Sequence, residues 1–258
     1  MFASVSLFDK RIGNSLKSGE MWRLGSIVFS KKTYLCSMRK YAVIVAGGNG
    51  TRMGTSIPKQ FVEVGGVPVL MHTLRLFGLC DHRILVLPAD GHELWHYLCK
   101  KHDFYLPVEL VAGGQTRFHS VLNGLAKVPN DVLVAVHDGV RPFVARQVLE
   151  RAFQVAEQHG SAVPAVEPVD SLRILKGQDS HAINRSMVRI VQTPQVFRST
   201  ELKKAYRQDY RDSFTDDASV WEAAGFPVCL VDGNAENIKL TRRQDLAMAE
   251  ILLQHGPY

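Results

Sequence analysis

Two basic residues follow a run of glycines near residue 50 of the chain. Gly47, Gly48 and Gly50 fall within four residues, and glycines leave backbone N–H groups unshielded, so that these groups can surround an anion. Arg52 then supplies a forked guanidinium and Lys59 a mobile ammonium, a combination that can neutralise a polyphosphate during a reaction. We therefore predict that this loop binds phosphate and carries the charges that catalysis requires.

The glycine pattern alone does not identify a nucleotide-binding protein. No Gly-Lys-Ser/Thr follows the loop, as a Walker A motif would require, and Met53 occupies the last glycine position of Gly-x-Gly-x-x-Gly. A turn with incidental surface charges remains an alternative when the loop is considered by itself.

A second pair of glycines leads into a segment with helical spacing. Gly113 and Gly114 follow an apolar run, and Ser120 comes shortly after them. Unpaired N–H groups at the start of a helix, together with a hydroxyl group, could hold a base or a ribose. An ordinary strand-to-helix connection is an equally good interpretation of these residues alone.

A carboxylate and an arginine follow the most apolar run of the chain, in a His-Asp-Gly-Val-Arg-Pro sequence. A carboxylate beside a polyphosphate would repel it unless a cation intervenes, so Asp138 indicates Mg²⁺-assisted chemistry or a hydroxyl partner. The alternative is that Asp138 and Arg141 pair with each other and only shape the turn.

Strand-like and helix-like segments alternate from Met38 onward and would position these motifs. Apolar runs predict strands at 41–46, 83–88, 108–111, 132–137 and 161–166, and helical spacing predicts helices at 69–77, 93–102, 116–127 and 147–159. The alternation is typical of an α/β, Rossmann-like fold with a mostly parallel sheet and helices on both faces. In such folds ligands gather at the carboxyl ends of the strands, where the glycine loop would lie.

The alternation stops between residues 166 and 192. Residues 167–175 and 183–191 have the pattern of two strands of a long hairpin, with the polar residues 176–180 as the turn between them. A hairpin of two strands is only marginally stable in water. We therefore predict a protruding arm, at about 166–192, that packs against a second copy of the chain.

Two segments near the C-terminus carry capping or charged residues. Thr215 and the two aspartates that follow it form a good helix start. Lys239 precedes a terminal helix that is predicted from Arg242. By itself, a lone lysine in this position would normally face solvent.

The order of these motifs resembles the signature of nucleotidylyltransferases that join a nucleoside triphosphate to a sugar or polyol phosphate. The matching motifs are Ala-Gly-Gly-x-Gly-Thr-Arg-Met with Pro-Lys-Gln, Gly-Gly-x-x-Arg-x-x-Ser-Val, His-Asp-Gly-x-Arg-Pro, Thr-Pro-Gln and Asn-Ile-Lys-x-Thr. They extend from Met38 to the C-terminus and are most similar to those of the 2-C-methyl-D-erythritol 4-phosphate cytidylyltransferase family. Gln115 replaces an acidic residue that some relatives carry.

The resemblance implies a role for each candidate residue. Charge stabilisation at the α-phosphate is implied for Arg52 and Lys59, nucleotide binding for Ala46, Gly47, Gly114 and Ser120, and substrate positioning for Arg185, Lys239, Asp138 and Thr215. The implied cofactor is Mg²⁺ or another divalent cation, held mainly by the CTP phosphates and not by a set of protein ligands. The arm is implied to clasp a partner in a homodimer.

The implied reaction is the transfer of CMP from CTP to 2-C-methyl-D-erythritol 4-phosphate, with release of pyrophosphate, in the non-mevalonate pathway to isoprenoid precursors. The attacking phosphate oxygen is already anionic, so catalysis depends on positioning two anions and stabilising charge. One alternative is a ribitol 5-phosphate cytidylyltransferase, whose motifs overlap almost completely. Another is a non-catalytic nucleotide-binding regulator, against which the joint presence of Arg52, Lys59 and Lys239 argues.

The composition limits the other classes of protein. A chain of 258 residues, 46% of them hydrophobic, can form one sizeable α/β domain. The net charge is +6, but residues 1–37 hold six basic and two acidic residues, which leaves 25 basic against 23 acidic residues elsewhere. A nucleic-acid-binding surface is therefore not expected.

Four cysteines without a Cys-x-x-Cys pair fit a reducing cytoplasm. No apolar run is long enough to span a bilayer.

Residues 1–37 are predicted to be a disordered or misannotated N-terminal extension. They contain no hydrophobic run long enough for a signal peptide, and Asp9 and Glu20 count against a transit peptide. Because Met38 stands three residues before the first predicted strand, translation is predicted to begin there. The cytidylyltransferase domain that the resemblance implies would then cover residues 38–258.

Overall fold

The computed structural model describes residues 22–24, 27–29, 38–47 and 57–256 of the chain. The chain divides into two compact units, Met1–Ser37 and Met38–Tyr258. In the first unit, β1 (Trp22–Leu24) pairs antiparallel with β2 (Ile27–Phe29), and its other residues lie outside the described part of the chain. The prediction that residues 1–37 are disordered or misannotated therefore stays a prediction.

Deleting residues 1–37 is expected to leave both the melting temperature and the activity unchanged. The segment lacks the apolar periodicity needed to join a core, and the second unit contains the whole central sheet. The full chain and a chain that begins at Met38 would be compared by thermal unfolding and by turnover. A large fall of the melting temperature in the shortened chain would show that the extension is structural.

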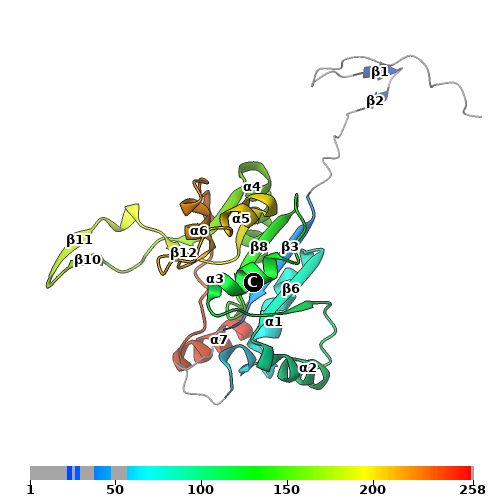
Figure 1. The fold of residues 1–258 in the computed structure, drawn as a ribbon, viewed down its shortest axis with the longest axis horizontal. Helices are drawn as coiled ribbons and strands as arrows, with labels where there is room; N and C mark the ends of the chain where they lie inside the picture. The colour runs from blue at the N-terminus through cyan, green and yellow to red at the C-terminus, as the bar shows by residue number, and fades with distance from the viewer. Residues whose placement is uncertain (1–21, 25–26, 30–37, 48–56, 257–258) are drawn as a thin grey trace, which may run out of the picture. The chain divides into compact units, whose positions relative to one another are not determined.

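The second unit is built on a mostly parallel sheet (Figure 1). Its strands follow the order β12-β9-β13-β8-β3-β6-β7, and β14 adds to β9. Their bounds are β3 (Lys40–Val45), β6 (His82–Leu87), β7 (Glu109–Ala112), β8 (Leu133–Asp138), β9 (Ser161–Val166), β12 (Ile190–Val191), β13 (Gln195–Arg198) and β14 (Leu230–Asp232). The pairs of β3 with β6 and β8, of β6 with β7 and of β14 with β9 are parallel, whereas β13 and β12 run antiparallel to their neighbours.

Helices cover both faces of this sheet. Successive side chains of β3 point to opposite faces, so that Ala42 and Ile44 join one apolar cluster and Val43 and Val45 join another. The first cluster includes side chains of α1 (Val69–Leu76), α2 (His92–Lys101) and α4 (Arg146–His159), and the second those of α3 (Arg117–Leu125), α5 (Ser199–Ala205) and α6 (Asp217–Ala223). Strands buried on both faces read as continuous apolar runs. The predicted Rossmann-like α/β fold is confirmed.

The C-terminal helix packs beside the turn that follows β8. The helix predicted from Arg242 is α7 (Arg243–His255), and its Ala249 joins a third apolar cluster with Val140 and Leu240. A short hairpin of β4 (Glu63–Val64) and β5 (Val67–Pro68) contributes Val64 to the same cluster. This packing fixes the chain on the C-terminal side of Lys239. None of the described helices is long and apolar enough to cross a membrane.

The predicted arm is present, but both of its strands differ from the prediction, in which the first strand covered 167–175. β10 (Leu172–Lys176) pairs antiparallel with β11 (Asp179–Ile183) outside the central sheet (Figure 1). Gly177 adopts the left-handed conformation, with φ of +62°, and permits a turn tighter than the predicted 176–180. The second strand was predicted at 183–191. It ends at Ile183 because Asn184 caps a 3₁₀ turn at Arg185–Met187, after which β12 joins β9.

Candidate active site

A pocket opens at the carboxyl ends of β3 and β8, the edge of the sheet at which ligands were expected. Its lining includes these residues of the predicted site: Ala46, Gly47, Lys59, Gly114, Ser120, Asp138 and Lys239. Arg117 and Gln60, for which no role was predicted, line the pocket as well. The fold therefore brings together side chains from widely separated motifs.

Two of the remaining predicted residues, Thr215 and Arg185, do not line this pocket. Thr215 lines an adjoining pocket, which shares Arg117, Asp138 and Lys239 with the first. Arg52 belongs to residues 48–56, which lie outside the described residues. Its predicted role in charge stabilisation stays a prediction.

Arg185 lies on the exposed arm, in the 3₁₀ turn Arg185–Met187. Its guanidinium donates a hydrogen bond to the carbonyl oxygen of Val169 in the same arm. Neither of the two pockets is lined by Arg185 of the same chain. The substrate-positioning role predicted for Arg185 would therefore require the arm of another copy.

The loop between β7 and α3 is shaped by hydrogen bonds to Ser120. Its hydroxyl accepts a hydrogen bond from the Gly114 backbone N–H at 3.1 Å and donates one to the carbonyl oxygen of Thr116 at 3.0 Å. A Cβ atom on Gly114 would lie 2.5 Å from the Cβ of His119, so only glycine fits this loop. Ser120 thus holds the backbone of the segment for which nucleotide binding was predicted.

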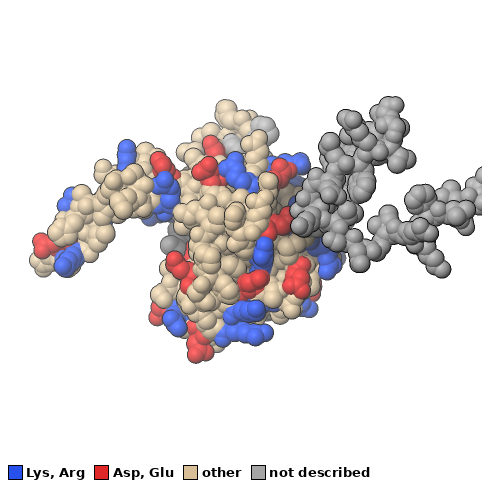
Figure 2. Space-filling view, turned by 90° about the horizontal axis from the view of Figure 1, so that it is seen from above, with Lys and Arg blue, Asp and Glu red and all other residues tan. Residues whose placement is uncertain are grey.

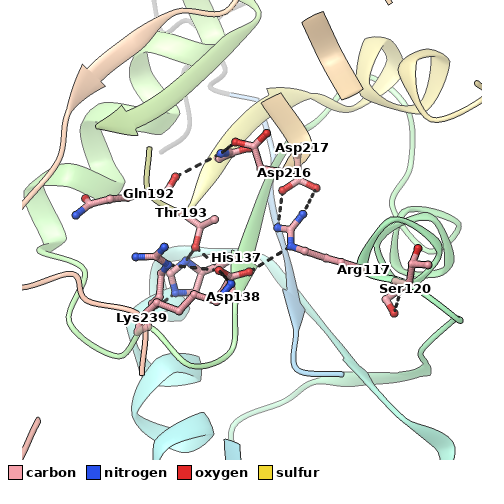
Figure 3. A network of polar contacts seen from close by, with 12 residues as sticks. Arg117, Ser120, His137, Asp138, Gln192, Thr193, Asp216, Asp217 and Lys239 are labelled. Carbon is pink, nitrogen blue, oxygen red and sulfur yellow. Dashed lines mark hydrogen bonds and ion pairs between the residues drawn. The ribbon is translucent and has the colours of Figure 1, made fainter. Parts of the chain in front are cut away.

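Asp138 is the carboxylate around which the cations of the site gather (Figure 3). Lys239 Nζ lies 2.9 Å from Oδ2, Arg141 Nε 3.4 Å from the same oxygen, and Arg117 Nε 3.3 Å from Oδ1. Burial by itself would raise the pKa of Asp138, but the charges of Arg117, Lys239 and Arg141 outweigh it and hold the pKa well below its usual range. Asp138 is therefore ionised at neutral pH.

This cluster contains the Asp138–Arg141 pair that was considered as an alternative, but it is more than a turn contact. Lys239, from the distant Asn-Ile-Lys motif, makes the shorter contact with Asp138. Arg117 also pairs with Asp217, so the three cations face two carboxylates and leave more positive than negative charge in this cluster. Such an excess favours a phosphorylated ligand, because phosphate oxygens accept charge-assisted hydrogen bonds from lysine and arginine.

An ion pair that was not predicted joins Arg117, which is partly buried and lines the pocket, to the fully buried Asp217. Arg117 Nη1 and Nη2 donate to the two carboxylate oxygens of Asp217 at 3.0 and 2.7 Å. Tyr206 donates its hydroxyl to Asp217 Oδ1 at 2.6 Å. Burial lowers the pKa of Arg117, but Asp217 and Asp138 raise it well above its ordinary value, while burial and Asp217 raise the pKa of Tyr206. The arginine is therefore a cation and the phenol is protonated at neutral pH.

Only one of the two residues of this pair, Arg117, could have been identified from the sequence. Arg117 is the arginine of the Gly-Gly-x-x-Arg-x-x-Ser-Val motif, so its position in the motif could have marked it. Asp217 has the pattern of an ordinary acidic residue in the first turn of a helix. The two residues are 100 positions apart, and only the folded sheet brings them into contact.

His137 is fully buried and holds the backbone around Asp138. Its Nε2 donates to the carbonyl oxygen of Arg141 at 3.0 Å, and its Nδ1 accepts a hydrogen bond from the Thr193 hydroxyl at 3.0 Å. The same hydroxyl accepts a hydrogen bond from the Asp138 N–H at 3.1 Å. The side-chain amide of Asn237 donates to the Thr193 carbonyl oxygen at 2.8 Å. These bonds connect the turn after β8 to the segment that carries Lys239.

The burial of His137 is expected to make stability depend on pH below neutrality. Burial lowers its pKa from 6.5 to about 4, so between these values the unfolded chain binds a proton that the folded chain excludes. Stability is full above pH 6.5 and falls as the pH approaches 4, by about 2 kcal/mol between pH 7 and pH 5. Urea unfolding at both values would measure this loss. A His137→Gln variant is the control, since it should show a smaller loss, and an equal loss would contradict the assignment.

The described residues do not form a metal site of their own. No group of three or more His, Cys, Asp and Glu side chains lies in a position to hold a metal ion within the described part of the chain. Asp138, which lines both pockets, is already contacted by three cations. That a divalent cation is held mainly by the CTP phosphates stays a prediction.

The site lies at the strand ends of a mostly parallel sheet and combines glycine-containing loops with a cluster of cations. These features define a Rossmann-like α/β protein with a site for phosphorylated ligands. The family model described as 2-C-methyl-D-erythritol 4-phosphate cytidylyltransferase matches residues 41–255. The chain belongs to this family. The predicted class of enzyme, a nucleotidyltransferase, is confirmed by this membership.

Individual relatives match nearly the whole second unit. The chain is 52% identical over 217 residues to the 2-C-methyl-D-erythritol 4-phosphate cytidylyltransferase of Porphyromonas gingivalis, a match that covers 83% of this chain and 98% of the relative. It is 50% identical over 219 residues to the protein of the same name from Phocaeicola vulgatus, which covers 84% of this chain and 100% of the relative.

Solved structures agree with the fold. The crystal structure of 4-diphosphocytidyl-2C-methyl-D-erythritol synthase from Anaerococcus prevotii matches with a TM-score of 0.73 at 28% identity and covers 86% of this chain and 98% of that one. The 2-C-methyl-D-erythritol 4-phosphate cytidylyltransferase of Thermus thermophilus matches with a TM-score of 0.68 at 31% identity and covers 84% and 100%.

Proposed function

We propose that the chain transfers CMP from CTP to 2-C-methyl-D-erythritol 4-phosphate and releases pyrophosphate, in the non-mevalonate pathway to isoprenoid precursors. The observation that carries this proposal is the pocket at the ends of β3 and β8, where a glycine-shaped loop lies beside a carboxylate surrounded by cations. Family membership, through the match at residues 41–255, supports the choice of both substrates.

The proposed step is an in-line attack of an acceptor phosphate oxygen on the α-phosphorus of CTP. A bond forms between this oxygen and the α-phosphorus, and the bond to the oxygen of the β-phosphate breaks. Pyrophosphate leaves with the bonding electron pair. Because the attacking oxygen is anionic at neutral pH, no general base is needed, and the protein contributes positioning and charge stabilisation.

On the acceptor side, the cations around Asp138 are proposed to hold the phosphate. Lys239 and Arg141 both contact Asp138 Oδ2 and can turn N–H groups toward an incoming phosphate oxygen. Asp138 would align the acceptor, whose hydroxyl groups can donate to a carboxylate. Thr215, in the adjoining pocket, is proposed to complete this side of the site.

On the nucleotide side, the loops at the strand ends are proposed to bind CTP. The residues concerned are Ala46, Gly47, Gly114 and Ser120, all of which line the first pocket. Lys59, in the same lining, is proposed to stabilise the charge that develops on the α-phosphate. Arg52 is assigned the same role on the strength of the motif alone.

The divalent cation, Mg²⁺ or another, is proposed to enter with CTP as part of the substrate. It would neutralise charge on the triphosphate, which lowers the cost of bringing a second anion close. The single carboxylate that lines the first pocket among the described residues, Asp138, supports a metal held mainly by phosphate oxygens.

The protein is proposed to act as a homodimer in the cytoplasm. Large apolar side chains are exposed on and beside the arm, among them Val169, Leu175 and Met187, which are 85%, 79% and 83% exposed. A second copy could cover them, and its Arg185 would then reach the acceptor. On the face that Figure 2 shows, basic and acidic side chains are interspersed. That the protein does not bind nucleic acid stays a prediction from the charge of residues 38–258.

Pyrophosphate release with two acceptors tests the proposal. The purified chain would be given equal CTP and Mg²⁺, with either 2-C-methyl-D-erythritol 4-phosphate or ribitol 5-phosphate. Much faster release with the methylerythritol phosphate is expected. Faster release with ribitol 5-phosphate would show that ribitol 5-phosphate is the acceptor. No release with either compound would favour the non-catalytic nucleotide-binding regulator.

A further inference from the structure

Asp217 is a carboxylate that is fully buried outside both pockets. It receives two N–H groups of Arg117, at 3.0 and 2.7 Å, and the hydroxyl of Tyr206 at 2.6 Å. A carboxylate paired with both arms of a guanidinium fixes the plane of that guanidinium as well as its distance. Asp217 therefore determines how Arg117 is oriented.

Arg117 connects this buried anion to the site. Its third nitrogen, Nε, donates to Asp138 Oδ1 at 3.3 Å (Figure 3). Arg117 also lines both pockets. Lys239 and Arg141 both contact the other oxygen, Oδ2. Among the described residues, Arg117 is the cation that contacts Oδ1, so the two oxygens of the Asp138 carboxylate face different cations.

The start of α6, the helix that carries Asp217, is held by several hydrogen bonds. Asp216 caps α6 by accepting a hydrogen bond from the Ser219 N–H at 2.9 Å, and the Ser219 hydroxyl accepts a hydrogen bond from the Asp216 N–H. The side-chain amide of Gln195 accepts from the Ala218 N–H and donates to Asp216 Oδ2, both at 2.8 Å. Gln195 belongs to β13, which pairs directly with β8, the strand that ends in Asp138.

We propose that Asp217 is a positioning residue, which acts through Arg117 to set the orientation of Asp138 and, with it, the alignment of the acceptor phosphate. The inference rests on the proposed function, because Asp138 is assigned to the acceptor side of that reaction. Asp217 would then affect the binding and reaction of the acceptor without contacting either substrate.

Asp217→Asn tests this role, because an amide of the same shape cannot accept both arms of the Arg117 fork. Steady-state kinetics would be measured against 2-C-methyl-D-erythritol 4-phosphate and against CTP, together with thermal unfolding. We expect the KM for the acceptor to rise about tenfold and kcat to fall about tenfold or more, since a small misplacement at a reacting group has a large effect on rate. The KM for CTP is expected to stay within about twofold.

Tyr206→Phe is the matched control. It removes one hydrogen bond from the same carboxylate but leaves the Arg117 fork, and its ring can still stack on Phe118, at a centroid distance of 4.7 Å. It is expected to lower the melting temperature without changing the KM for the acceptor. If Asp217→Asn fails to fold, Arg117→Lys, which keeps the charge and loses the fork, should also raise the acceptor KM about tenfold. Because Arg117 also lines the pocket assigned to the nucleotide, the KM for CTP is not used as the control in this variant.

Two results would overturn the inference alone. One is a folded Asp217→Asn or Arg117→Lys enzyme with the wild-type KM for the acceptor and a loss of rate that matches the loss of folded protein. The other is an equal rise in the acceptor KM in Tyr206→Phe. Absence of pyrophosphate release by the wild-type chain with any polyol phosphate would instead overturn the proposed function, and this inference with it.

Discussion

Replacing Lys59 with alanine is expected to lower turnover by about two or more orders of magnitude, the usual effect of removing a charge-stabilising donor from a preorganised site. Lys59 begins the 3₁₀ turn Lys59–Phe61 and lines the first pocket. The negative charge on the α-phosphate grows as the acceptor attacks, so the ammonium contributes more in the transition state than in the bound substrate. The loss is therefore expected in kcat more than in KM.

The fold is expected to survive this change, because the side chain of Lys59 is not part of an apolar cluster. Lys100→Ala is a matched control, since Lys100 is exposed on α2 and lines neither pocket. Its turnover should equal that of the wild type. If Lys59→Ala also kept near-normal turnover and a normal melting temperature, the charge stabilisation would have to come from another residue.

Mixing two inactive variants is expected to restore activity if the site is shared between subunits. Arg185 lies on the exposed arm and lines neither pocket of its own chain. A hairpin of two strands gains stability when another copy covers it, and exchange in a twofold dimer covers both arms. Arg185 would then complete the site that contains Lys59 of the partner.

The expected recovery follows from counting sites after Lys59→Ala and Arg185→Ala chains exchange in equal amounts. About half of the dimers are mixed, and in each of these one site carries both substitutions and the other carries neither. About a quarter of all sites therefore regain full function. If Arg185 acted in its own chain, every site would keep one substitution. No recovery after verified exchange would reject the shared site.

The central sheet could be predicted because its strands are buried on both faces. β3, β6, β8 and β9 each contain a run of buried apolar residues, and the helices between them have 3.6-residue spacing. β13 could not be predicted in the same way. It has four residues, and its place between β8 and β9, antiparallel to both, depends on long-range pairing.

The arm shows where local patterns stop being informative. Residues 183–191 were predicted to form one strand, but Asn184 accepts a hydrogen bond from the Ser186 N–H and begins a 3₁₀ turn. Side chains such as that of asparagine compete with the sheet for backbone donors. Ile190 and Val191 then pair with β9 and belong to the central sheet.

The candidate site could be predicted where its residues follow strands. Gly114 follows β7 and Asp138 is the last residue of β8, so the parallel sheet brings them to one edge. Contacts that depend on the order of strands could not be predicted, and the clearest case is the pair of Arg117 and Asp217. The role of His137 was also missed, because burial and a tautomer fixed by Thr193 leave no trace in the sequence.

The central claim is that an acceptor phosphate oxygen attacks the α-phosphorus of CTP, and phosphorus NMR of one reaction tests it most directly. The chain would be incubated with CTP, Mg²⁺ and 2-C-methyl-D-erythritol 4-phosphate. We predict that the monoester signal of the acceptor is replaced by two mutually coupled signals of a diphosphate, with an equal amount of pyrophosphate. An unchanged acceptor signal, or formation of CMP and pyrophosphate at the same rate without acceptor, would contradict the claim.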